Sequence, residues 1–436
     1  MRRYIVILCL SALGLTGLMV SCGEDRTYQY DELTKGNHSM VGILQESYLW
    51  ADQMKTDIDW KGYFGSGETF FKKLLYSKDS WSYCTIDTVQ ADKFARGYFN
   101  HLNSYGMDFD VMTDPTGGTN RSYARVLYVA TGSEADKAGV QRGDFISFIN
   151  GNRVATSNAS KMVSGDSITL TINHIEYNIE EELLYWADTT EVVLGKSSYV
   201  EDYPYFVTAA FSYQSRTIGY MMDTRLIAGP YEKDPQSVEY RDDMDSIFAT
   251  FKSLGVNELI VDLRYCNRGE MSMVERLASY IAAYHHDGEA FLTSHWRDDL
   301  SSHNAEYNYD LSLTNGNALD LSRVTFITSR YTTGPAEWLI HGLQHTLGAD
   351  NVHIIGLTTA GQNVMTSAVS TDFSMTLYPV VAYVGDATGD YDYSAGIAPT
   401  FEVDEASYVH MYNFGGFEEI LFFDAVYSLF HSNQEE

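Results

Sequence analysis

The sequence has few cysteines and few basic residues for its length. Only 4 of the 436 residues are cysteine, and Cys9 and Cys22 lie in the first 22 positions. Cys84 and Cys266 remain, and one possible pair cannot make a disulfide framework, so the fold must rest on its core. Lys and Arg number 29 against 59 Asp and Glu, a formal net charge of -30. This balance argues against a nucleic-acid partner, because phosphate binding needs a basic face.

The overall composition is that of a folded protein. Hydrophobic residues make up 44% and charged residues 20%, which argues against disorder along most of the chain. At roughly 150 residues for each domain, the length indicates two to four domains. After the N-terminal 20 residues, no run has the length and apolarity of a membrane span.

The N-terminus reads as a secretory signal. Arg2 and Arg3 precede an apolar run over residues 4–20, which is shorter than the ~20 residues that an uncleaved anchor needs. The stretch that ends at Cys22 resembles a bacterial lipoprotein cleavage box, which implies lipidation of Cys22. The acidic residues 24–25 then resemble the start of surface-exported lipoproteins of the Bacteroides group. The resemblance implies a cell-envelope lipoprotein, held on the outer membrane through its lipid and exposed at the surface.

Hydrophobic spacing predicts a small helical N-terminal domain. Met40, Leu44 and Tyr48 lie on one helical face, and the aromatic stretch 69–75 indicates a second helix. The expected organisation comprises a signal peptide, a polar tether, the helical domain, a β-rich domain and an α/β core. Their boundaries are residues 1–21, 22–37, 38–96, 97–192 and 193–436, respectively.

The β-rich segment has an ordered series of signals. A strand over 125–129 precedes a short helix within 132–140, and a strand over 143–149 ends in an Asn-Gly turn. This series resembles a PDZ domain. The resemblance implies strand addition of a peptide whose C-terminal carboxylate binds backbone amides, with the nest at Tyr105, Gly106 and Met107. The alternative is a PDZ-like unit that only packs between domains.

From residue 205 onward, strands and helices alternate. Strands are expected at 218–222, 258–262, 324–327 and 352–355. Helices are expected at 242–254, 272–283, 335–347 and 417–430. This alternation predicts helices that cover a mostly parallel sheet, so the fold class is a multidomain mixture of α/β and α+β parts.

Three stretches of the α/β core, in this order, resemble the carboxyl-terminal processing (tail-specific) serine proteases. They are residues 261–269, 332–337 and 355–364, and the Gly-Ile-Ala-Pro at 396–399 resembles a closing turn of that family. With the preceding domains the resemblance covers about residues 38–430. It implies a crotonase-like ββα core and serine-type proteolysis.

The expected catalytic pair is nevertheless substituted. Members of this family use a serine nucleophile and a lysine base, and the alignment on Glu337 places the nucleophile position at Gly334. The base position falls on Gln362, whose amide cannot take a proton near neutral pH. The oxyanion turn falls near Gly269, where Asn267 and Arg268 replace part of the family's glycine-rich sequence.

Four other side chains could act as a displaced nucleophile. They are Ser329, Thr332, Thr333 and Cys266, and none has an evident base in the sequence. A threonine before a helix is more often its N-cap, and a lone cysteine is more often a small buried hydrophobe.

His341 and His345 share one face of the 335–347 helix, where they could bind zinc. Their order is not the His-Glu-x-x-His of zinc proteases, so a solvated polar face is the preferred interpretation. No metal and no cofactor are expected.

The sequence therefore predicts a lipid-anchored homologue of tail-specific serine peptidases that binds extended peptides or protein C-termini. In this interpretation Gly334 and Gln362 make it a pseudoenzyme. One alternative is an active serine-type endopeptidase with a displaced nucleophile. Another is a surface lipoprotein that binds glycans or small ligands.

Overall fold

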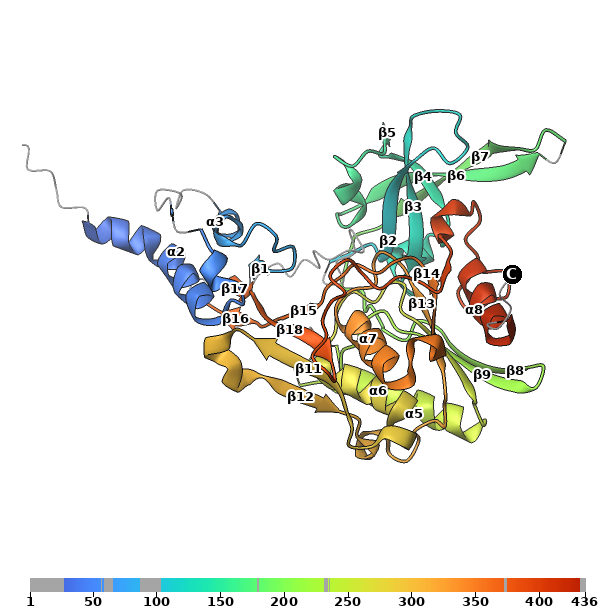
Figure 1. The fold of residues 1–436 in the computed structure, drawn as a ribbon. Helices are drawn as coiled ribbons and strands as arrows, with labels where there is room; N and C mark the ends of the chain where they lie inside the picture. Colours follow the sequence, from blue (N-terminus) through green and yellow to red (C-terminus); the bar gives the residue numbers. More distant parts are fainter. Residues whose placement is uncertain are drawn as a thin grey trace, which may run out of the picture.

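The computed structural model describes residues 27–55, 57–58, 66–86, 103–178, 180–230, 234, 236–371 and 375–431. The expected signal peptide and Cys22 lie outside these residues, as does the expected end of the helical domain, residues 87–96. Within the described part, the protein is a mixed α/β chain built around four β-sheets, as Figure 1 shows. No described helix is long and apolar enough to cross a membrane.

The N-terminal part combines two helices with a small antiparallel sheet. Its elements are α2 (Thr27–Ser47), α3 (Gly67–Leu74), β1 (Tyr83–Ile86), β16 (Val369–Ser370) and β17 (Met375–Tyr378). Both expected helices are present, but α2 already begins within the expected tether, because Thr34 is fully buried and the helix continues through it. Strand β1 was not expected. It pairs with β17 from the C-terminal half, so this part of the fold is not formed by the N-terminal segment alone.

A second, antiparallel sheet occupies the region expected to be β-rich. Its strand order is β2-β3-β4-β6-β7, with β5 paired to β4. The elements are β2 (Met107–Thr113), β3 (Ser122–Val129), α4 (Glu134–Lys137), β4 (Phe145–Ile149), β5 (Asn152–Arg153), β6 (Ile168–Asn178) and β7 (Leu183–Leu194). Asn150 and Gly151 have φ of 49° and 73°, which suits the tight hairpin turn that the Asn-Gly pair predicts.

The central sheet has the order β19-β14-β13-β10-β9-β8, and every neighbouring pair except β8–β9 is parallel. This confirms the expected mostly parallel sheet. Its strands are β8 (Thr208–Tyr213), β9 (Arg216–Met222), β10 (Glu258–Asp262), β13 (Val324–Thr328), β14 (Val352–Gly356) and β19 (Phe401–Glu402).

Helices cover both faces of the central sheet. They are α5 (Glu239–Ser253), α6 (Met271–His286), α7 (Pro335–Leu347) and α8 (Ile420–His431). Strand β10 shows why its sequence is continuously apolar: Leu259 and Val261 face the core formed with α5, α6 and α7, whereas Ile260 faces α8. A parallel strand buried on both faces needs apolar residues at successive positions.

A four-stranded antiparallel sheet packs beside α7. Its order is β12-β11-β18-β15, and sequence patterning did not predict it. The strands are β11 (Ala290–Trp296), β12 (Ala305–Asn308), β15 (Val364–Thr366) and β18 (Val380–Asp386). Short 3-10 helices complete the described elements: η1 (Ala51–Gln53), η3 (Ala159–Met162), η4 (Asp298–His303), η5 (Leu311–Thr314), η6 (Ala349–Asn351) and η7 (Glu405–Ser407).

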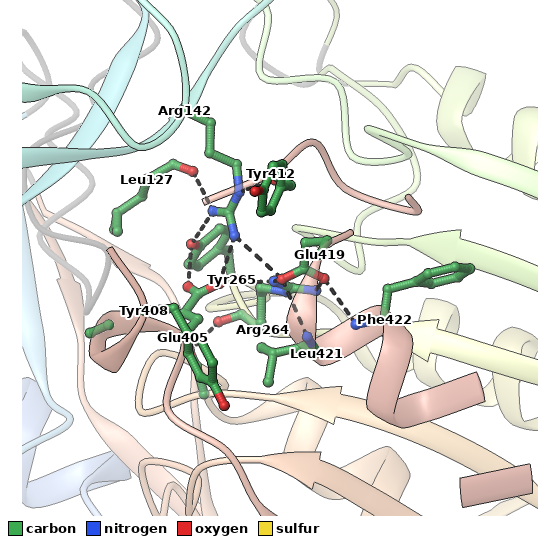
Figure 2. Close-up of polar contacts among 12 residues, drawn as sticks. Leu127, Arg142, Arg264, Tyr265, Glu405, Tyr408, Tyr412, Glu419, Leu421 and Phe422 are labelled. Atoms are coloured by element: carbon green, nitrogen blue, oxygen red, sulfur yellow. Dashed lines mark hydrogen bonds and ion pairs between the residues drawn. The ribbon is translucent and has the colours of Figure 1, made fainter. Parts of the chain in front are cut away.

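A buried charge network joins the β2–β7 sheet to the central sheet (Figure 2). Arg142, from the loop before β4, and Arg264, from the turn after β10, both donate to Glu405 Oε2, at 2.7 and 2.8 Å. Arg264 also bonds both oxygens of Glu419, and the Tyr265 hydroxyl donates to Glu405 Oε1 at 2.6 Å. Burial alone would raise the pKa of Glu405, but the two arginines hold it at about 2. The C-terminal segment therefore fixes how the two sheets meet.

Candidate functional site

The turn between β13 and α7 has an unusual backbone at Gly334. Its φ is 53° and its ψ is -107°, and Pro335 then opens the helix. This conformation is strained for any residue with a Cβ. Strain of this kind is stored at functional sites, and a sharp strand-to-helix turn that exposes its central side chain is a known way to present a nucleophile.

The structure brings Gly334 and Gln362 together. A Cβ at position 334 would lie 3.0 Å from Gln362 Oε1 and 3.3 Å from its Nε2. The Gln362 side chain is held in this place by a hydrogen bond from Nε2 to the Val364 carbonyl at 3.2 Å. A side chain at position 334 would therefore point at the end of residue 362. Neither residue supplies a hydroxyl or a proton acceptor suited to general-base chemistry.

Glu337 joins the two loops that carry this pair. Its Oε2 accepts the backbone N–H groups of Gly334 and Gln362, both at 2.8 Å. Its Oε1 accepts the Gly361 N–H at 2.6 Å and the Thr359 hydroxyl. Burial raises the pKa of Glu337, while these four hydrogen bonds act in the opposite direction. The sequence analysis used Glu337 as an alignment marker and missed this positioning role, because three of its four partners lie 22 to 25 residues further along the chain.

A cavity of about 300 Å³ opens beside the pair. It is lined by Gln362, Pro335, Trp338 and Gly269 among others, so the expected base position and the expected oxyanion turn share one space. Gly269 is required there by close approach, since a Cβ would lie 2.6 Å from the Leu226 Cβ and 3.0 Å from the Pro335 Cβ. No lysine and no histidine line this cavity among the residues that the structure describes.

The residues just before Gly269 do not offer backbone N–H donors alone. Asn267 lines the cavity and is 5% exposed, and its Oδ1 has no hydrogen-bond partner within the described structure. Arg268 also lines the cavity, and its carbonyl accepts the Leu226 N–H at 3.0 Å. This side of the cavity therefore offers the Asn267 side-chain acceptor in addition to backbone groups.

The hydroxyl groups considered as displaced nucleophiles are bound to backbone carbonyls. Ser329 Oγ donates to the Arg264 carbonyl, Thr332 Oγ1 to Leu263 at 2.8 Å, and Thr333 Oγ1 to Tyr331 at 3.0 Å. None of these three hydrogen bonds involves a histidine, lysine or carboxylate base.

Cys266 is fully buried in the main core, and Cys84 is buried in the N-terminal one. The two cysteines lie in different cores, and no disulfide joins them.

The expected carboxylate nest lies apart from this cavity, in the β2–β7 sheet. Gly106 has φ of 85°, but its N–H already donates to Ser104 Oγ at 2.8 Å, and the Tyr105 N–H donates to the Val163 carbonyl at 2.9 Å. The side chains of Tyr105 and Met107 are buried. Two of the three expected donor amides are thus engaged within the protein. Strand β2 itself lies at the edge of its sheet.

His341 and His345 meet carboxylates that the sequence could not place beside them. One donor atom each from His341, Asp386 and Asp390 lie within 4.8 Å of one another, and His345 Nδ1 lies 3.2 Å from Asp386 Oδ2. His341 Nε2 bonds the Asp390 carbonyl at 2.7 Å, and Asp386 also accepts bonds from its own loop. These contacts account for the cluster without an ion.

The described architecture defines a class of protein: an α/β chain whose parallel sheet carries a strained strand-to-helix turn beside a cavity. The family model for the peptidase S41 N-terminal domain matches residues 36–83. A crystal structure of a putative S41 protease from Bacteroides fragilis NCTC 9343 is similar over almost the whole fold. It has 26% sequence identity and a TM-score of 0.78, and the match covers 91% of this chain and 98% of that chain. Together these findings show that the chain is similar to S41 peptidases, in sequence over residues 36–83 and in fold over most of its length.

Two further solved structures are similar only at TM-scores below 0.5. The photosystem II D1 C-terminal processing protease has 15% identity and a TM-score of 0.47, and the match covers 85% of this chain and 93% of that chain. Mature CPAF complexed with lactacystin has 12% identity and a TM-score of 0.48, and the match covers 87% of this chain and 94% of that chain. No curated protein matches the sequence.

Proposed function

We propose that this protein is an exported lipoprotein of the S41, tail-specific peptidase type that binds extended peptides or protein C-termini without cleaving them. One observation carries the proposal: the place where a side chain at position 334 would meet residue 362 holds no hydroxyl, and the facing group is the Gln362 amide. Without a nucleophile and a proton acceptor, no acyl-enzyme can form at this turn.

Peptide binding is supported by what the cavity retains. Asn267 Oδ1 is a buried acceptor that a ligand N–H could pair with. Burying an acceptor without a partner costs about 1–3 kcal/mol, and a hydrogen bond from the ligand would recover that cost. The apolar faces of Trp338 and Met365 lie on the same lining. An extended peptide presents N–H groups and side chains in alternation, which suits such a cavity.

The β2–β7 sheet supports a second contact with the peptide. Strand β2 lies at the sheet edge, where a peptide strand could pair if the sheet binds peptides as a PDZ domain does. In this proposal a C-terminal carboxylate would take over the Gly106 N–H that Ser104 Oγ now accepts. Peptides with a free C-terminus should therefore bind more tightly than amidated ones, as measured by titration calorimetry. Equal affinity, or no binding of either form, would reject tail recognition.

Catalysis is tested with unfolded casein as the substrate. We expect no turnover by the wild type and none by Gly334→Ser, because a serine without a base is a weak nucleophile and the turn strains it. Gly334→Ser combined with Gln362→Lys should recover a trace at most, since Asn267 and Arg268 still alter the oxyanion turn and one missing donor costs about 10²–10³ in rate.

A robust wild-type activity would overturn the proposal. If that activity vanished on changing Ser329, Thr332, Thr333 or Cys266, the protein would be an endopeptidase, and the variant would identify its displaced nucleophile.

A further inference from the structure

A second and larger cavity lies away from the Gly334–Gln362 pair. We call it the aromatic groove. It has a volume of about 870 Å³ and runs between the segment after α2, the start of η4 and strand β18. In Figure 1 the end of α2 lies beside the β11–β18 sheet, and the Leu49 N–H bonds the Val380 carbonyl at 2.8 Å. The groove is therefore a junction between two parts of the chain that are distant in sequence.

Four aromatic side chains line this groove, and their contacts fix three of the rings. The rings of Tyr383 and Tyr391 stack with centroids 4.4 Å apart and planes 11° apart. Trp50 meets Tyr383 edge to face and donates its indole N–H to the Tyr383 hydroxyl at 2.9 Å. Tyr391 remains 39% exposed, and Trp296 completes the aromatic lining. The aromatic surface is preorganised, so a ligand would not have to order it.

The charge of the groove is negative. Arg297 is its only lysine or arginine, and its guanidinium is already engaged with Asp299 and with the carbonyls of Gln45, Glu46 and Tyr48 at the end of α2. Asp52 and Asp298 also line the groove and are exposed. Across the described residues neither of these two carboxylates forms an ion pair. A positive ligand is therefore favoured over a neutral or negative one.

The groove is distinct from the cavity of the candidate site. Val364 pairs with Tyr383, so their side chains share one face of the β15–β18 ladder, whereas Met365, the next residue, lines the other cavity. Alternate residues of a strand point to opposite faces. Asn363 nevertheless links the two places, because its Nδ2 donates to the Tyr391 carbonyl at 2.7 Å.

We propose that the aromatic groove binds the lysine or arginine side chain of a peptide ligand. The cation would lie against the exposed aromatic faces while Asp52 and Asp298 balance its charge. This inference rests on the proposed function in one respect, namely that the ligand is a peptide. It adds a preference for basic residues, which the candidate cavity does not supply.

The probe is an N-acetylated, C-terminally amidated peptide, Gly-Ala-Lys-Ala-Gly, compared with the same peptide carrying norleucine in place of lysine. Because neither probe has a free carboxylate, the result is independent of tail recognition. We expect the purified protein to bind the lysine peptide at least fivefold more tightly, as measured by titration calorimetry with the unlabelled peptides. The preference should shrink at 1 M salt.

Matched variants locate the binding. Asp52→Asn with Asp298→Asn should weaken lysine-peptide binding about tenfold, and Tyr391→Ala should weaken it about two- to fivefold. Glu181→Gln, an exposed acid in the turn between β6 and β7, should leave it unchanged. Thermal unfolding of each variant confirms that it is folded.

Equal binding of the lysine and norleucine peptides, or no binding of either, would refute this proposal. It would also fail if the double asparagine variant bound normally. Binding of a neutral oligosaccharide that is lost in Tyr391→Ala, without any lysine preference, would identify a sugar site instead. If free-acid peptides show no advantage over amidated ones while the lysine preference holds, tail recognition fails and the groove stands.

Discussion

Replacing Glu337 by glutamine tests whether one carboxylate organises the candidate site. The side chain accepts four hydrogen bonds, from the N–H groups of Gly334, Gly361 and Gln362 and from the Thr359 hydroxyl. Glutamine keeps the size of the side chain but offers one oxygen and one NH2 group. With its oxygen toward Gly334 and Gln362, its NH2 group faces Gly361 N–H and the Thr359 hydroxyl.

The expected loss of stability follows from the number of buried donors that lose their acceptor. Thr359 Oγ1, which already accepts the Ile397 N–H, can also accept from the new NH2 group, but its own hydrogen and the Gly361 N–H both lose their acceptor. Each buried donor without a partner costs about 1–3 kcal/mol, so the two together should lower the free energy of unfolding of Glu337→Gln by about 2–6 kcal/mol. Glu337→Ala leaves all four donors without this acceptor and should cost more.

Urea denaturation measures the loss of stability, and hydrogen exchange with mass spectrometry locates it. In Glu337→Gln, exchange should accelerate in peptides that contain Gly361 and Gln362 while β10 stays protected. Glu181→Gln is the matched control, because it makes the same chemical change at an exposed turn. If Glu337→Gln had wild-type stability and wild-type exchange at residues 359–362, the carboxylate would not organise the site.

Three further predictions concern the sheet junction and the N-terminus. Arg142→Met should lower the free energy of unfolding by about 3–5 kcal/mol in urea titrations, because it leaves part of the charge of Glu405 uncompensated in a buried site. The folded pKa of Glu405, at about 2, lies below its ordinary value of 4.5, so its contribution is complete above pH 4.5 and is lost as the pH falls toward 2. The wild type should therefore lose roughly 3 kcal/mol of unfolding free energy over this pH range. Urea titrations between pH 2 and 6 should show a smaller loss for Glu405→Gln. Cys22→Ala should release the protein from the outer-membrane fraction or leave it unprocessed, and an unmodified mature N-terminus elsewhere in mass spectra would contradict lipidation at Cys22.

Local sequence patterns predicted the elements whose stability is decided within a short window. The helix 335–347 and the strand 258–262 have the predicted bounds, because a Pro at the helix start and a continuous apolar run act over a few residues. The Asn-Gly turn at 150–151 is a local signal of the same kind. Motif order also brought attention to Gly334, Gln362 and Gly269, which the structure places around one cavity or beside it.

Local sequence patterns could not predict the contacts between segments that are distant in the sequence. Strand β1 is only four residues long and is defined by pairing with β17, and Arg142 finds Glu405 only when the two sheets have docked. Strand pairing and buried ion pairs take their energy from partners far along the chain, and each partner alone carries no periodic signal.

By itself the sequence determined where four of the five parallel strands of the central sheet and its covering helices form, and that position 334 has no nucleophilic side chain. Only the tertiary structure decided that Glu337 holds the two site loops together and that Trp50 meets Tyr383 in the aromatic groove. The physical reason is the same in both cases. A local conformation depends on neighbours within a few residues, whereas a site depends on side chains that only the packed chain brings within hydrogen-bond or ring-contact distance.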